Sequence, residues 1–128
     1  MNFIRLYANN GSLPSSDFRR VELIYFENGR SELKILQGRG PEESIIDREI
    51  KQTDKKQFKK LLEKGKQLNE QNESELNIGG PEKLLEIKHG NETKKISISE
   101  KNLKAFSFFM QCLSVYNSNL KSRLVEIL

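Results

Sequence analysis

The first third of the chain contains short runs rich in β-branched and aromatic residues, bounded by turn formers, which is the pattern of β-strands. We expect strands over residues 3–8 (FIRLYA), 19–27 (RRVELIYFE) and 31–37 (SELKILQ). Asn28-Gly29 separates the last two runs and favours a type I′ turn, which needs positive φ at both central residues. The pattern therefore predicts a hairpin from Val21 to Leu36. The stretch NNGSLPSSD after the first strand consists of turn formers, so we expect an exposed and mobile loop there.

The middle of the chain changes from strand periodicity to helix periodicity. Residues 38–43 (GRGPEE) indicate a loop, and residues 44–51 (SIIDREIK) a further edge strand. A helix is predicted from Thr53 or Asp54, because Asp54 and Gln57 resemble a capping box. Apolar residues then recur at three- and four-residue spacing on one face: Phe58, Leu61, Leu62, Gly65 and Leu68. This helix is amphipathic, with a lysine-rich outer side.

The second half repeats the plan of a hairpin followed by a helix. After a polar linker or long loop at 69–80, residues 83–88 and 93–98 predict a second hairpin. Ser99 is the expected cap of a closing helix with a broad apolar stripe. One line of the stripe is Leu103, Phe106, Met110 and Leu113, and beside it lie Phe109, Cys112 and Tyr116. A short amphipathic segment follows at 117–128, with Leu120, Leu124, Ile127 and Leu128.

The segment 44–51 alternates only loosely, and without it the order of elements is β-β-β-α-β-β-α, which predicts an α+β fold. We expect a mostly antiparallel sheet of about 4–6 strands, with two helices packed on one face. The length of 128 residues suits a single domain covering residues 1–128, in which 117–128 forms a C-terminal extension.

Few residues of the chain suggest chemistry. One histidine, His89, and one cysteine, Cys112, exclude multi-histidine and thiolate metal sites. His89 lies in a predicted turn and Cys112 in the thickest part of an apolar stripe, so neither is expected to be reactive. Asp47 and Glu49 would share one face of a strand, where a solvated edge is a better interpretation than a catalytic pair. We expect no enzyme, no catalytic residues, no metal and no cofactor.

The cellular location is predicted from signal-peptide and membrane-span patterns. The first ten residues have no signal-peptide pattern, and no apolar run has the length of a membrane span. A lone cysteine fits a reducing compartment. We therefore expect a cytoplasmic protein without membrane contact.

Positive charge gathers between Lys51 and Lys66, where seven lysines face only Asp54 and Glu63. Lysines on one helix face can neutralise phosphates, which makes four of them candidates for nucleic-acid binding: Lys55, Lys56, Lys59 and Lys60. Neither arginine nor interleaved aromatic residues accompany them, so a solvated lysine face is the better interpretation. Nucleic acid is not the partner that we expect.

Arginines offer an alternative function. An oligomer could capture a nucleotide or phosphate ester if four arginines met across a subunit boundary: Arg19, Arg20, Arg30 and Arg39. The segment Gly38-Arg39-Gly40 could also present N–H groups to an anion, although it lacks the spacing of either glycine-rich phosphate loop.

Elimination favours a non-enzymatic binding module that acts on a protein partner as an inhibitor, immunity-type protein or adaptor. Side chains in or near the N-terminal loop are the candidate contacts: Leu13, Pro14, Phe18, Tyr7 and Tyr25. The apolar residues of the tail, Leu120, Leu124, Ile127 and Leu128, either pack back on the domain or form a homodimer contact.

The order of elements also resembles the emfourin family, small bacterial inhibitors of thermolysin-like metalloproteases. The resemblance spans about residues 3 to 116, from the first strand and the Asn10-Gly11 and Leu13-Pro14 loop through RRVELIYF and the helix. It continues through the hairpin LLEIKHGNETKKISI to the closing helix. The resemblance implies that the N-terminal loop is the inhibitory element.

Overall fold

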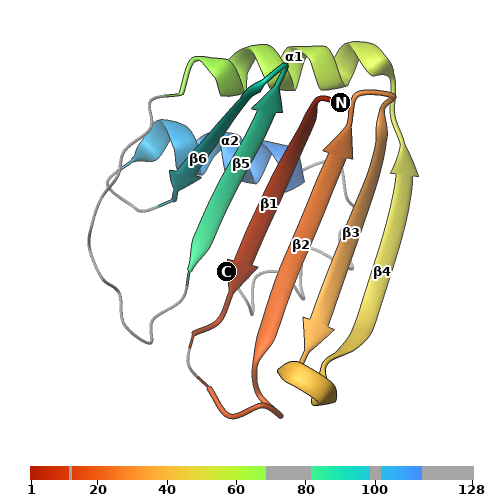
Figure 1. The fold of residues 1–128 in the computed structure, drawn as a ribbon, viewed down its shortest axis with the longest axis vertical. Helices are drawn as coiled ribbons and strands as arrows, with labels where there is room; N and C mark the ends of the chain where they lie inside the picture. Colours follow the sequence, from red (N-terminus) through yellow and green to blue (C-terminus); the bar gives the residue numbers. More distant parts are fainter. Residues whose placement is uncertain (12, 69–81, 99–101, 114–128) are drawn as a thin grey trace.

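The computed structural model describes residues 1–11, 13–68, 82–98 and 102–113. Within these residues, six strands form one antiparallel sheet in the order β4-β3-β2-β1-β5-β6, accompanied by two α-helices (Figure 1). The strands are β1 (Phe3–Asn9), β2 (Arg19–Phe26), β3 (Arg30–Gln37), β4 (Ser44–Gln52), β5 (Lys83–His89) and β6 (Glu92–Ser97). The helices are α1 (Lys55–Lys66) and α2 (Leu103–Leu113), and a short 3-10 helix, η1 (Gly40–Glu42), precedes β4. The predicted α+β class is confirmed, and so is the order of elements except that β4 forms as well, so four strands rather than three precede α1.

One face of the sheet forms the core with both helices. The period of two along each strand places these apolar residues on that face: Ile4, Leu6, Ala8, Val21, Leu23, Tyr25, Leu33, Ile35, Leu85, Ile87, Ile96 and Ile98. Figure 1 shows the sheet from its other side, which we call the open face. None of the helices in the described ranges is long and apolar enough to cross a membrane.

Helix α1 lies against the sheet through the apolar face that its sequence predicts. Phe58, Leu61, Leu62 and Gly65 are buried. A Cβ atom at Gly65 would lie 2.6 Å from Cδ1 of Ile87, so the glycine permits the helix to approach β5 closely. Asp54 is the N-cap, as predicted, but its side chain accepts from the N–H of Lys56 at 3.0 Å rather than from that of Gln57.

The C-terminal end of α1 is capped by a side chain from the sheet. The Lys94 ammonium, on β6, donates to the carbonyl of Lys66 at 2.8 Å and to that of Leu68 at 2.7 Å. These carbonyls have no partner within the helix. A cation at this end also interacts favourably with the helix dipole. The second hairpin therefore fixes where α1 ends.

The first hairpin forms as predicted, but its turn differs. Asn28 does not have positive φ, so the type I′ turn is wrong. Three residues, 27–29, connect β2 to β3, and Gly29 has φ of +87°. The carbonyl of Gly29 accepts from both the N–H and the hydroxyl of Thr53, each at 2.8 Å. These two hydrogen bonds attach the turn to the segment that precedes α1.

Helix α2 begins later than predicted and buries only part of the predicted apolar stripe. It starts at Leu103, and the Asn102 side chain accepts from the N–H of Ala105 at 3.2 Å, whereas Ser99 lies outside the described residues. The buried residues are Ala105, Phe108, Phe109, Cys112 and Leu113. Phe106 is partly buried against the core, so the predicted line is wrong at Leu103, which is 72% exposed, and at Met110, which is 42% exposed. Packing of the two adjacent phenylalanines against the sheet decides which apolar face turns inward.

Candidate functional site

The N-terminal loop, of which the structure describes residues 10, 11 and 13–18, lies beside the connection between β3 and β4, residues 38–43, at one end of the sheet (Figure 1). The N–H of Gly38 donates to the carbonyl of Phe18 at 3.1 Å, and that of Arg39 to the hydroxyl of Ser15 at 3.1 Å. The Gln37 side chain donates to the carbonyl of Ser16 at 2.9 Å. The loop is exposed over much of its described length, as expected, and these hydrogen bonds attach it to the neighbouring connection.

Arg39 makes the largest number of these contacts. Its guanidinium donates to the carbonyls of Leu13 and Gly11, the latter at 3.1 Å. Its Cζ atom also lies 3.9 Å from the centroid of the Phe18 ring. Phe18 is only 8% exposed, so the ring is an inner support of the loop rather than a contact for a partner.

Asn10 and Arg19 close the base of the loop. The Asn10 side chain donates to the carbonyl of Asp17 at 3.0 Å and accepts from the N–H of Arg19 at 2.8 Å. The Arg19 guanidinium donates to the carbonyl of Ser16 at 2.9 Å. Inside the loop, the carbonyl of Pro14 accepts from the N–H groups of Asp17 and Phe18. Most of these acceptors are backbone carbonyls, so the backbone path is fixed and the tip side chains stay available.

The tip of the loop presents apolar groups to solvent. Leu13 is 41% exposed and Pro14 is also exposed. The connection beside it adds the exposed Pro41 and leads into Ile45, which is 52% exposed, and Ile46, which is 42% exposed. The loop thus exposes apolar groups on a hydrogen-bonded backbone, the combination that suits a protein contact.

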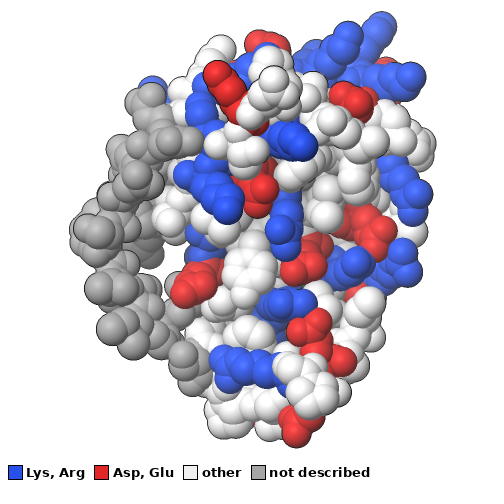
Figure 2. All heavy atoms as spheres, viewed as in Figure 1, with Lys and Arg blue, Asp and Glu red and all other residues white. Residues whose placement is uncertain are grey.

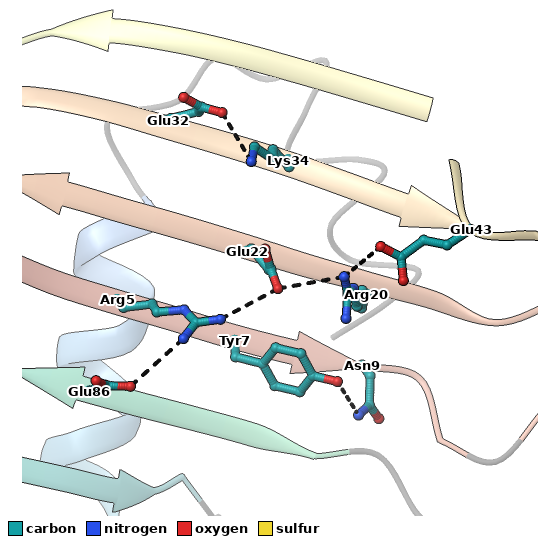
Figure 3. A network of polar contacts seen from close by, with 9 residues as sticks. All are labelled: Arg5, Tyr7, Asn9, Arg20, Glu22, Glu32, Lys34, Glu43 and Glu86. Atoms are coloured by element: carbon teal, nitrogen blue, oxygen red, sulfur yellow. Dashed lines mark hydrogen bonds and ion pairs between the residues drawn. The ribbon is translucent and has the colours of Figure 1, made fainter. Parts of the chain in front are cut away.

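The two predicted tyrosines lie elsewhere. Tyr25 is 0% exposed in the core, where its hydroxyl donates to the carbonyl of Cys112 at 3.1 Å, and we remove it from the candidate contact surface. Tyr7 lies half-buried on the open face, and its hydroxyl accepts from the side-chain amide of Asn9 at 3.1 Å (Figure 3). Leu13 and Pro14 are thus the two predicted contact residues that the loop exposes.

The structure does not bring the four predicted anion-binding arginines together within one chain. Arg30 begins β3, at the end of the sheet opposite the loop. Arg19 and Arg39 donate to loop carbonyls, as described above. The guanidinium of Arg20 lies 2.7 Å from the carboxylate of Glu43 and 3.8 Å from that of Glu22. Three of the four guanidinium groups therefore already interact with protein oxygens.

A ladder of ion pairs crosses the open face (Figure 3). Arg5 lies 3.5 Å from Glu22 and 3.9 Å from Glu86, and Arg20 continues the chain to Glu43. Charged residues of both signs are mixed over this face in Figure 2. Because each guanidinium has a carboxylate nearby, the ladder is a poor site for a free anion.

A second cluster on the open face centres on Glu32. Its carboxylate lies 3.3 Å from Lys34 and 3.2 Å from Arg48. Burial of the carboxyl raises the pKa of Glu32, but the hydrogen bonds and positive charges of Lys34 and Arg48 outweigh it and hold the pKa below its ordinary value. Such a carboxylate stays ionised, which suits an ion pair and not a general acid.

The four lysines considered for nucleic-acid binding, Lys55, Lys56, Lys59 and Lys60, are all exposed on the outer side of α1. The predicted acidic pair also takes its expected place: Asp47 and Glu49 share one face of β4, opposite Ile35 and Leu33. The ammonium of Lys51 lies 3.9 Å from the carboxylate of Glu49. The pair belongs to a charged strand edge.

Cys112 and His89 are the two remaining candidates for catalysis, and they do not form a reactive pair. Burial raises the pKa of the Cys112 thiol to about 12, so the thiolate is scarce at neutral pH. His89 is exposed at the end of β5, whereas Cys112 is wholly buried on α2. Across the described ranges, no group of three or more histidine, cysteine, aspartate or glutamate side chains is arranged to hold a metal ion.

Residues 10–18 and 38–43 therefore define the candidate site by their geometry and exposure. No protein-family model matches the chain, and no curated protein matches its sequence.

Proposed function

We propose that this chain is a non-enzymatic binding module for a protein partner and that the N-terminal loop is its contact surface. The observation that carries the proposal is the pairing of a fixed backbone with an exposed apolar tip. Arg39 holds the loop through the carbonyls of Gly11 and Leu13, while the Leu13 side chain remains 41% exposed. Exposing an apolar side chain costs free energy in the unbound protein, and a partner that covers it recovers that free energy.

The fixed backbone supports this function energetically. A loop that must be ordered on binding loses affinity, at about 0.5–1.5 kcal/mol for each immobilised side chain. In this chain the hydrogen bonds of Asn10, Arg19 and Arg39 order the loop before any partner arrives. The contacts of Arg19, Arg20 and Arg39 with protein oxygens favour protein binding over the capture of a small anion.

The experiment that tests the proposal is affinity capture by the immobilised chain, with mass-spectrometric identification of what is retained. Leu13→Asp should abolish capture of a stoichiometric partner, because a charge replaces the apolar tip. Met110→Asp is the matched control, since Met110 is 42% exposed and belongs to α2, whereas the loop lies at the end of the sheet (Figure 1). Both variants should keep the melting temperature of the parent chain.

Two results would contradict the proposal. Retention of the same partner by Leu13→Asp would reject the N-terminal loop as the contact. Capture of no stoichiometric protein from lysates of the source organism, its competitors and its host would reject the protein-binding function itself.

The inhibitor form of the proposal can be tested on its own. The resemblance to emfourins stays a prediction, and it requires stoichiometric inhibition of a thermolysin-like metalloprotease that Leu13→Asp weakens. Full protease activity in the presence of excess chain would reject this form and leave the immunity-type and adaptor forms. A cytoplasmic location is part of the same proposal, and a tagged chain found outside the cytoplasm would overturn it.

A further inference from the structure

A groove runs between α1 and α2 on the helical side of the molecule. One part of it is lined by residues of both helices: Lys64, Leu68, Leu103, Lys104, Ser107, Phe108 and Gln111. A second hollow along α1 shares Lys64 and Gln111 with the first. Its other lining residues are Asp54, Lys56, Gln57, Lys59, Lys60, Leu61 and Glu63. Because the two hollows share these residues, they form one continuous surface, which we call the helix groove. The Lys64 ammonium donates to the side-chain oxygen of Gln111 at 3.4 Å where the two helices come together.

The helix groove combines an apolar floor with an unusual apolar rim. Leu61 and Phe108 are both 4% exposed and form part of the floor, and Leu68 is half-buried beside them. Leu103, at the start of α2, is 72% exposed, the most exposed large apolar side chain in the described residues after Met1. An apolar residue this exposed at the edge of an apolar groove marks a surface that another molecule can cover.

Positive charge gathers around this groove. Helix α1 carries six lysines and Glu63 as its single acidic residue, and α2 adds Lys104 without any acidic residue. On the open face, by contrast, each of the cations Arg5, Arg20, Lys34 and Arg48 lies within ion-pair distance of a glutamate. These four cations of the open face are therefore paired, whereas the lysines of α1 and α2 share their helices with a single carboxylate, Glu63.

We propose that the helix groove docks an acidic, amphipathic segment of a partner protein. Its carboxylates would lie near Lys60, Lys64 and Lys104, and its apolar residues against Leu68, Leu103 and Phe108. A helix with acidic and apolar residues at three- and four-residue spacing has this distribution. The groove lies on the helical side of the sheet and the N-terminal loop at its end, so this surface is separate from the first (Figure 1).

The lining favours a protein segment over nucleic acid. The cations are lysines, which do not offer the bidentate geometry that arginine gives to phosphate. The aromatic ring in the groove, Phe108, is 4% exposed and does not present a face on which a base could stack. An apolar floor gains free energy from leucine and isoleucine side chains but nothing from a phosphate backbone.

The test uses a synthetic acidic peptide as the probe. An amphipathic helical peptide of glutamate and leucine is titrated into the ¹⁵N-labelled full chain, in parallel with a peptide of the same composition in scrambled order and with oligothymidylate. We expect the amphipathic peptide to shift the amide resonances of residues 60–68 and 103–111 and to bind at least about tenfold more tightly than the scrambled peptide.

Variants distinguish the groove from general charge attraction. Leu103→Asp and the pair Lys64→Glu with Lys104→Glu change exposed side chains, and each should weaken peptide binding by about tenfold or more. Lys95→Glu is the control, because Lys95 is exposed on β6 and lies on the open face. It should leave the affinity unchanged.

Several results would overturn the proposal. Equal binding of the scrambled peptide would show simple charge attraction, and tighter binding of oligothymidylate that displaces the peptide would assign the lysines to nucleic acid. A dimer of the free chain that Leu103→Asp dissociates in sedimentation would assign the groove to a second copy. Absence of any shift in residues 60–68 and 103–111 would also reject it.

Discussion

The guanidinium of Arg39 lies over the ring of Phe18, with 3.9 Å between its Cζ atom and the ring centroid. The two residues come from different connections, one from the N-terminal loop and one from the segment between β3 and β4. The same guanidinium donates hydrogen bonds to the carbonyls of Gly11 and Leu13. One side chain thus joins the two connections that form the candidate site.

Arg39→Ala should loosen the N-terminal loop without unfolding the domain. The variant loses both hydrogen bonds to the loop carbonyls and the contact with Phe18, which together contribute about 1–2 kcal/mol to the free energy of unfolding. Amide exchange should accelerate at Leu13, Asp17 and Phe18, whose N–H groups donate within the loop. Exchange of the core amides of β1 and β2 should follow only the small change in global stability.

Arg30→Ala is the matched control, because Arg30 is exposed at the opposite end of the sheet. It should leave loop exchange unchanged. Equal loop protection in Arg39→Ala and the parent chain would show that the backbone hydrogen bonds hold the loop without Arg39.

Gly29→Ala should destabilise the fold by about 2–4 kcal/mol. A Cβ atom there would lie 2.1 Å from the carbonyl oxygen of Thr53, and the residue would also keep a positive φ of +87°. Thr53 cannot move away freely, because its N–H and hydroxyl both donate to the Gly29 carbonyl. The measurement is urea denaturation followed by circular dichroism.

Gly90→Ala isolates the conformational part of this effect. Gly90 has φ of +60°, but no atom lies within 4 Å of the place its Cβ would take. This variant should lose only about 1 kcal/mol. If the two variants lost equal stability, the contact with Thr53 would have no energetic role.

Much of the fold could be predicted because apolar residues recur at a different spacing in the strands than in helix α1. Runs such as RRVELIYF alternate, whereas α1 repeats its apolar residues at three- and four-residue spacing. The exact buried face of α2 could not be predicted in the same way, since the exposed Leu103 and Met110 are as apolar as the buried Phe108. When both sides of a helix are apolar, tertiary packing decides which side is buried.

The candidate site was less predictable, for a physical reason. Arg39 and Arg19 hold the loop through backbone carbonyls, which every residue carries, so no side-chain pattern reveals the contact. Tyr25 differs, because the sequence contained a signal for its burial. It lies two and four residues beyond Leu23 and Val21, and the period of two in β2 puts all three on the core face.

Lys94→Met should destabilise the domain through the end of α1. Methionine keeps the apolar stem but removes the ammonium that donates to the carbonyls of Lys66 and Leu68. We expect a loss of about 1–2 kcal/mol in the free energy of unfolding. Amide exchange should also accelerate at Gln67 and Leu68, which donate within the last turn. Lys95→Met is the control, since its exposed side chain lies on the other face of β6, and similar losses in both variants would contradict the capping role.

The buried thiol of Cys112 predicts a loss of stability in alkaline solution. Burial raises its pKa from the ordinary value of 9.0 to about 12, so the folded chain keeps the proton that the unfolded chain releases. The stabilising effect is complete below pH 9 and falls as pH rises toward 12, by about 1.4 kcal/mol for each pH unit in this window.

Urea denaturation of the parent chain and of Cys112→Ala, at about pH 8 and about pH 10, measures the difference. The alanine variant lacks this contribution, so the free energies of unfolding of the two proteins should converge as pH rises. A constant difference would mean that the thiol is reached by solvent in the folded chain, and rapid labelling of Cys112 by a thiol reagent without urea would show the same.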